Sequence, residues 1–148
     1  MTTVHFQLES PLAPDVVLAA VTDFGPSRST VWPNVDEDHF KVHGQGPGWA
    51  EVTEGSSVAG GVWERERYSW DAAARTVEIE TLDSNAWGPG SRWDYRFTRG
   101  SAGGTTIDVT VVWIGKRWKG RAIALGLSLV GAGMLRSQMK RALARITP

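Results

Sequence analysis

The sequence predicts an α+β fold in which a curved antiparallel sheet of about seven strands wraps around a long C-terminal helix, with two short helices after the first strand. Apolar and polar side chains alternate over several short stretches, as in half-buried strands. Glycine-rich turns separate successive stretches, which favours hairpins and antiparallel pairing. The 148 residues contain no repeat, linker or low-complexity segment, so we expect a single domain over residues 1–148.

The N-terminal region predicts one strand followed by two helices. Residues 4–9 place Val4, Phe6 and Leu8 on one face and polar residues on the other. A helix is expected from about Pro14 to Asp23, because proline suits the first helical position and Gly25-Pro26 ends the pattern. Residues 27–32 predict a second, shorter helix.

The middle of the chain predicts six further strands joined as a meander. Glycine-containing turns lie between several of them, including residues 44–48 and 100–104. The final stretch, roughly 117–146, predicts one long helix. The expected strands are residues 39–44, 49–54, 62–70, 76–83, 91–98 and 105–114.

Composition excludes several kinds of chemistry. The chain has no cysteine, which rules out disulfides, thiol catalysis and cysteine metal sites. His39 and His43 lie too far apart on an extended strand to share a metal, and no glycine-rich phosphate loop or nucleophile elbow occurs. We therefore expect neither metal nor cofactor. The polar residues of the first stretch are unlike a signal peptide, so the expected location is cytoplasmic.

The charge is balanced overall but asymmetric along the chain. Asp108 is the last acidic residue, and eight cations follow it, at positions 116, 117, 119, 121, 136, 140, 141 and 145. A basic helix resting on an acidic sheet is the favoured interpretation, and we expect no nucleic-acid partner. A basic face for anionic lipid is the alternative.

Residues 122–135 of the terminal helix carry no charge on any face. Fourteen residues are too few to span a bilayer, which needs about 20. Gly126, Gly131 and Gly133 weaken the helix and suggest close approach of another element, a kink or room for a ligand. Either the helix is covered on two sides, by the sheet and by the helices near residues 14–32, or it contacts a membrane or a second copy of the chain.

Eight tryptophans are the other unusual feature, and they either fill a core or line a pocket. Strand 62–70 is the ambiguous element. One face carries Trp63, Arg65, Arg67 and Ser69, and the other carries Val62, Glu64, Glu66, Tyr68 and Trp70. Whichever face points inward, a charged pair faces the concave side, so the cavity there is either wet or binds something.

Three segments carry a resemblance to a known family. SPLAPDVVLAAVTDF, followed shortly by Trp32-Pro33, looks like the first helix of the bacterial branch of the START/Bet v 1-like (SRPBCC) superfamily. VWERERYSWDAAARTV and WDYRFTRGSAGGT are similar to its polyketide aromatase/cyclase subfamily. The resemblance implies a helix-grip fold with a ligand cavity between the sheet and the C-terminal helix.

The resemblance also implies which residues line that cavity. It turns the face with Trp63 inward, and it matches the proton-donor arginine of the cyclases to Ser69, one step from Arg67 on the same face. Arg67 is accordingly the candidate catalytic residue. The candidate ligand-binding residues are Trp32, Trp63, Arg65, Ser69, Trp93, Tyr95, Val109 and Gln138.

Three functions follow as hypotheses. The first is a carrier or sensor for a hydrophobic or aromatic small molecule, lipid-like or polyketide-like, with Arg65 and Arg67 as anchors. The second is a polyketide cyclase or aromatase that uses Arg67. The third is a lipid-binding protein that docks on membranes through its basic helix. Glu64 and Glu66, as an acid–base pair, are a less favoured alternative because catalysis would need them to be buried.

Overall fold

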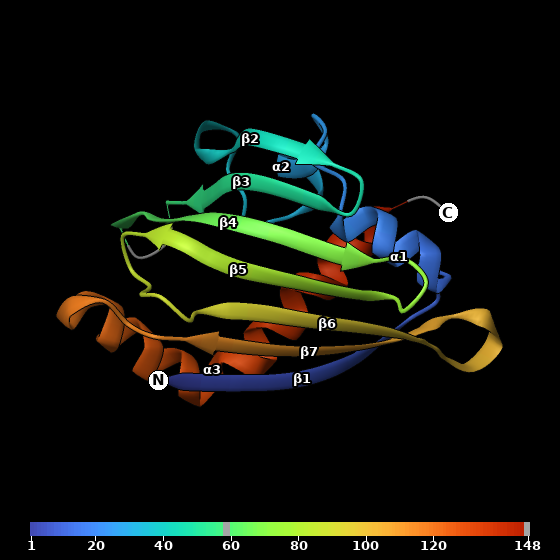
Figure 1. The fold of residues 1–148 in the computed structure, drawn as a ribbon. Helices are drawn as coiled ribbons and strands as arrows, with labels where there is room; N and C mark the ends of the chain where they lie inside the picture. Colours follow the sequence, from blue (N-terminus) through green and yellow to red (C-terminus); the bar gives the residue numbers. More distant parts are fainter. Residues whose placement is uncertain (58–59, 147–148) are drawn as a thin grey trace.

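The meander predicted from the sequence is confirmed in the computed structural model, which describes residues 1–57 and 60–146. Every neighbouring pair of strands is antiparallel, and the order across the sheet is β1-β7-β6-β5-β4-β3-β2 (Figure 1). The strands are β1 Thr2–Ser10, β2 Lys41–Gly46, β3 Trp49–Ser56, β4 Val62–Asp71, β5 Thr76–Ser84, β6 Arg92–Arg99 and β7 Thr105–Trp113.

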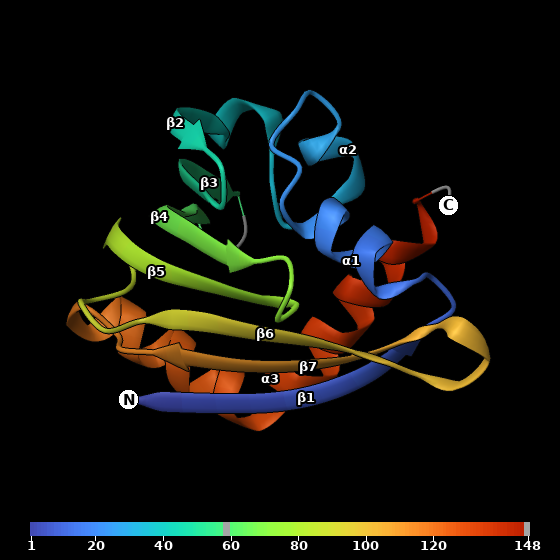
Figure 2. The ribbon, with the colours of Figure 1, turned by 45° about the vertical axis from the view of Figure 1, so that its right-hand side comes forward.

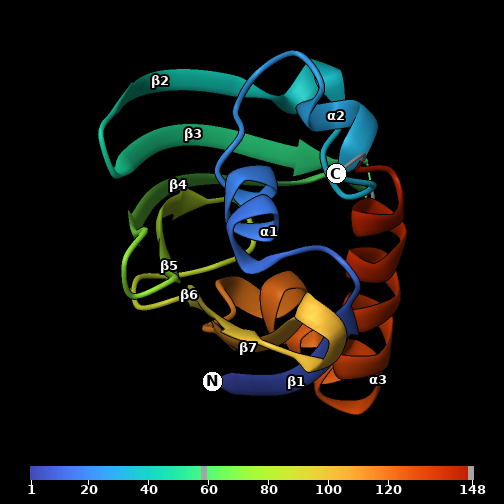
Figure 3. The ribbon, with the colours of Figure 1, turned by 90° about the vertical axis from the view of Figure 1, so that its right-hand side faces the viewer.

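The helices cover the concave side of this sheet. The long helix α3 (Arg117–Ala144) packs mainly along β1, and α1 (Pro14–Val21) and α2 (Arg28–Val31) follow β1 and lie across the open side of the curve (Figures 2 and 3). Two short 3-10 helices, η1 (Glu37–His39) and η3 (Ser101–Gly103), were not predicted. His39 therefore lies in a helical turn before β2 and not on the strand.

The alternation of the first and last strands fixes the core. Val4, Phe6 and Leu8 of β1 are buried against α3, as expected. The inward face of β7 is buried as well, and so is the stripe formed by α1 and by Phe24, three residues after its end. These residues are Ile107, Val109, Val111 and Trp113 on β7, with Val17, Val21 and Phe24.

A β-bulge interrupts the pairing of β4 with β5. Arg65 pairs with Asp83, but the next residue, Glu66, pairs with Thr81, so Leu82 is an extra residue in β5. Both Leu82 and Asp83 are exposed, whereas Thr81 and Ser84 are buried. The alternation of β5 therefore changes phase at Leu82.

Helix α3 buries one face and exposes the other. Ala124, Gly131 and Leu135 lie against the sheet, while Leu129 is 81% exposed and Leu125 is 67% exposed. The alternative of a helix covered on two sides is therefore wrong for this face. By length and mean hydropathy alone α3 could cross a membrane, a test that core helices of globular proteins also pass.

Candidate functional site

A cavity of about 230 Å³ lies between the concave face of the sheet and helices α2 and α3. An apolar cavity of about 150 Å³ is large enough to hold benzene, so this one has room for a single ring with a short substituent. Four of the predicted ligand-binding residues line it, namely Trp32, Trp93, Tyr95 and Gln138. Val109 points inward and is fully buried, but it packs in the core outside the cavity lining.

One wall of the cavity is a chain of aromatic rings. Trp87 stacks on Trp113 with ring centroids 5.5 Å apart, and Trp113 meets Trp93 edge to face at 5.6 Å. Trp93 in turn stacks with Tyr95 at 6.3 Å. Neither Trp87 nor Trp113 was among the candidate ligand-binding residues, although both line the cavity. The bridge between Trp87 and Gly115 turns the loop that carries Trp87 inward.

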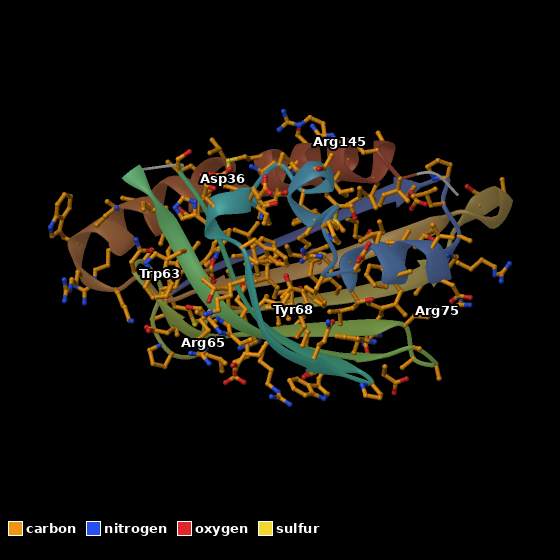
Figure 4. The ribbon with its side chains drawn as sticks, turned by 90° about the horizontal axis from the view of Figure 1, so that it is seen from above. Asp36, Trp63, Arg65, Tyr68, Arg75 and Arg145 are labelled. Atoms are coloured by element: carbon orange, nitrogen blue, oxygen red, sulfur yellow. The ribbon has the colours of Figure 1, made fainter. Side chains whose placement is uncertain are left out.

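A buried ion pair forms the floor at the α2 end. The Arg28 guanidinium donates to Glu54 at 2.7 Å, to the Tyr68 hydroxyl at 2.8 Å and to the Val21 carbonyl at 2.8 Å. Tyr68 then donates to the second oxygen of Glu54 at 3.0 Å. Figure 4 shows Tyr68 in the interior, between the sheet and the helices. Hydrogen bonds within the protein therefore hold all three nitrogens of the Arg28 guanidinium, and the charges of Arg28 and Glu54 balance each other.

Glu64 and Glu66 are the other charged residues of the lining, and the described chain places no cation beside them. Burial is the main cause that raises the pKa of Glu64, to about 7, and the nearby Glu54 adds to it. Burial and then the charges of Glu64 and Glu54 raise the pKa of Glu66 well above its ordinary range. The pair therefore holds protons at neutral pH that ordinary carboxyls would have lost.

The two carboxyls have few partners in the protein. The Thr81 hydroxyl donates to Glu64 at 3.0 Å, and the Trp87 indole and Glu66 also hydrogen-bond to Glu64. Apart from Glu64 itself, no side chain in the described ranges hydrogen-bonds to Glu66, which is only 5% exposed. The indole nitrogen of Trp32 is also buried without a partner among those residues. Buried polar atoms are usually satisfied, so these groups are available to a ligand.

The predicted orientation of β4 is wrong. Trp63, Arg65, Arg67 and Ser69 are exposed on the outer, convex face, and none of them lines the cavity. Arg65 forms an ion pair with Glu51 on β3 at 2.6 Å, and Arg67 lies over the Trp49 ring at 4.8 Å. Figure 4 shows Arg65 on the outside of the sheet. These cross-strand partners give the arginines a favourable environment outside the cavity.

A sequence signal for the correct face exists in the next strand. Val77 and Ile79 alternate with Glu78 and Glu80, so they must point inward. The short turn at residues 72–75 pairs them with Trp70 and Tyr68. Residues that pair directly across an antiparallel ladder share a face, which turns Tyr68, Glu66 and Glu64 inward. The family resemblance pointed to the opposite face.

No group of three metal-ligating residues occurs among the described residues.

The chain matches no family model, and no curated protein sequence matches it. Solved structures do match. A START superfamily protein from Mycobacterium smegmatis superposes with a TM-score of 0.77 at 10% identity, covering 99% of this chain and 97% of the other.

Two further solved structures also superpose on the chain, and one of them is named as an enzyme. The Zhui aromatase/cyclase from Streptomyces sp. R1128 gives a TM-score of 0.68 at 17% identity over 95% of this chain and 85% of its own. Major latex-like protein 151 from Panax ginseng gives 0.68 at 11% identity over 99% and 97%. These proteins are START/Bet v 1-like, and the chain has the helix-grip fold of that superfamily. At such identities the likeness establishes the fold alone.

Proposed function

We propose that the protein is a carrier or sensor that binds a small aromatic or hydrophobic molecule in the cavity between the sheet and α3. The continuous wall of Trp87, Trp113, Trp93 and Tyr95 is the observation that carries this proposal. Ligand sites typically combine apolar walls with a few polar groups that fix orientation. The helix-grip fold, shared with hydrophobic-ligand binders, supports the same conclusion.

Two measurements test this proposal. Native mass spectrometry of the freshly purified protein should reveal a bound small molecule, and titration with apolar aromatic compounds should change the tryptophan emission. Trp93→Phe should reduce that change because Trp93 lines the cavity. The matched control is Trp49→Phe, since Trp49 lies on the outer face under Arg67. Equal loss of signal in both variants, or no response across a broad panel, would refute cavity binding.

The position of Arg67 argues against the cyclase hypothesis, which needs this residue in the cavity. Arg67 is on the convex face over Trp49 and cannot reach a ligand in the cavity. Arg28, the arginine that does line it, is held by Glu54, Tyr68 and backbone carbonyls. We therefore expect Arg67→Ala to leave ligand affinity unchanged within about twofold, as is usual for a surface side chain. A loss of tenfold or more in the same fluorescence titration would contradict this orientation of β4.

The exposed face of α3 favours a second function, docking on an anionic membrane. Trp118, Leu125 and Leu129 recur at helical spacing, and Arg136 and Lys140 continue the same side of the helix. Arg121 adds a cation beside the apolar residues, and no carboxylate follows Asp108 in the sequence. Apolar side chains flanked by cations match an anionic lipid surface, where each Lys or Arg contributes about 1 kcal/mol.

Vesicle co-sedimentation tests this docking. Binding to vesicles of phosphatidylcholine with phosphatidylserine should exceed binding to pure phosphatidylcholine and should fall as salt is raised. The double variant Leu125→Ser/Leu129→Ser should lose most binding, whereas Arg99→Gln, a cation change at the far end of the sheet, should not. Equal binding to neutral vesicles would refute the proposal. The proposal would also be refuted if the protein were a dimer in solution and the double variant a monomer, because the exposed face of α3 would then be a dimer interface.

A further inference from the structure

The sign of the charge inside the cavity indicates a class of ligand. The charged residues of the lining are Arg28, Glu54, Glu64 and Glu66. Arg28 and Glu54 neutralise each other at 2.7 Å. What remains facing the open space is a pair of carboxyls, so the cavity offers a site for positive charge or for hydrogen-bond donors. The arginine anchors expected from the sequence would have favoured an acidic ligand instead.

The surroundings of the pair contain no competing cation. The Thr81 hydroxyl is the β5 neighbour of Glu64, Tyr95 on β6 lies near Glu66, and Glu54 on β3 adds negative charge beside both carboxyls. From α3 the lining residues are Ile123, Leu127, Met134, Leu135, Gln138 and Met139, none of which is charged. Arg28 lowers the pKa of Glu66 somewhat but is outweighed by burial and by Glu64. Within the described ranges the protein thus leaves the carboxyl pair without a counter-ion.

The aromatic wall complements the same charge. The faces of indole rings carry negative electrostatic potential and attract ammonium groups, most strongly where water is excluded. Trp32, Trp87, Trp93 and Trp113 all line the cavity together with the carboxyl pair. A cavity of about 230 Å³ limits the ligand to about one ring with a short chain.

We propose that the cavity selects a small aromatic molecule that carries a protonated amine, with the ammonium group bound by Glu64 and Glu66 and the ring packed among the tryptophans. This inference rests on the proposed function, because it requires that the cavity binds a ligand. The ammonium group supplies the donors that Glu66 lacks and the charge that the pair lacks. Because burial raises the pKa of both carboxyls, we expect binding of the amine to be accompanied by release of a proton to solvent.

Three probes of one size separate the alternatives, namely 2-phenylethylamine, 2-phenylethanol and phenylacetate. At pH 8 the amine is a cation, and this pH lies above the Glu64 pKa of about 7, so the carboxylate form of Glu64 is favoured. The amine should therefore bind at least about tenfold more tightly than the alcohol. Phenylacetate should bind most weakly because it is repelled by the pair. Amine affinity should fall as the pH is lowered through 7, while alcohol affinity should stay constant.

Isosteric variants assign the effect to the pair. Glu66→Gln should lower amine affinity about tenfold and leave alcohol affinity within about threefold. Glu64→Gln is the second variant, and Glu78→Gln, on the exposed face of β5, is the matched control that should change neither. Circular dichroism verifies that each variant is folded.

The outcomes distinguish this inference from the function on which it rests. If the alcohol binds as tightly as the amine at pH 8, or if Glu66→Gln leaves the preference intact, amine selection is wrong and cavity binding stands. If none of the three probes binds, both proposals fail for ligands of one ring.

Discussion

The carboxyl pair makes a quantitative prediction about stability that needs no ligand. Burial raises the pKa of Glu64 from its ordinary value of 4.5 to about 7. The folded state therefore binds this proton more tightly than the unfolded chain, and the free energy of unfolding falls as the pH rises from 4.5 through 7. At about 1.4 kcal/mol for each tenfold change in proton affinity, the whole loss is about 3 kcal/mol, and about 2–3 kcal/mol of it falls between pH 5 and pH 8.

Glu64→Gln should remove the part of that pH dependence that Glu64 contributes and leave the part that comes from Glu66, whose pKa burial also raises. The amide keeps the hydrogen bond with Thr81 and offers Glu66 a donor, so the variant should be more stable than the parent at pH 8 and nearly equal at pH 5. Urea unfolding followed by tryptophan emission at the two pH values measures both differences. Carboxyls with lowered pKa values, such as Asp108, act below this window and do not interfere. If Glu64→Gln and the exposed control Glu78→Gln lose the same stability between pH 5 and pH 8, the reasoning is refuted.

Three further substitutions test the packing, each by urea unfolding at pH 7. Arg28→Met leaves Glu54 charged, buried and without its ion-pair partner, and should lower the free energy of unfolding by about 3–5 kcal/mol. Adding Glu54→Met should restore much of that stability. If it does not, loss of the ion pair is not the cause. Gly133→Ala places a methyl group in open space on a helix and should stabilise by about 0.5–1 kcal/mol. Gly120→Ala should destabilise instead, because its methyl would collide with the Ala86 carbonyl, and a neutral effect would mean that the helix start shifts freely.

The sequence predicted the fold well because the fold depends on local alternation. The faces of β1 and β7 and the helix limits at Pro14 and near Arg117 follow from residues that are close in the chain. The site depends on contacts between distant residues. Arg28 and Glu54 are 26 positions apart, and nothing in either local pattern indicates that they meet.

The orientation of β4 shows why the rest could not be predicted from the strand alone. Both of its faces alternate charge with aromatic rings, so hydrophobic periodicity does not choose between them. The choice is made by neighbours, since Glu51 and Trp49 hold the arginines outside while Ile79 and Val77 pair with the inward residues. Because β4 faces the opposite way from the prediction, the cavity contains the acidic residues of the strand and not the arginines expected from the sequence.

The extra residue in β5 limits how many acids the interior holds. With unbroken alternation, Thr81 inside would be followed by Asp83 inside, a third acid beside Glu64 and Glu66. The insertion of Leu82 turns Asp83 outward, where it pairs with Lys116 at 3.2 Å, and brings in Ser84. The Ser84 hydroxyl accepts from the backbone N–H of Trp87 at 3.1 Å, so the same insertion that excludes an acid anchors a ring of the wall. Deleting Leu82 would therefore alter the charge and the shape of the interior together, although this residue itself faces solvent.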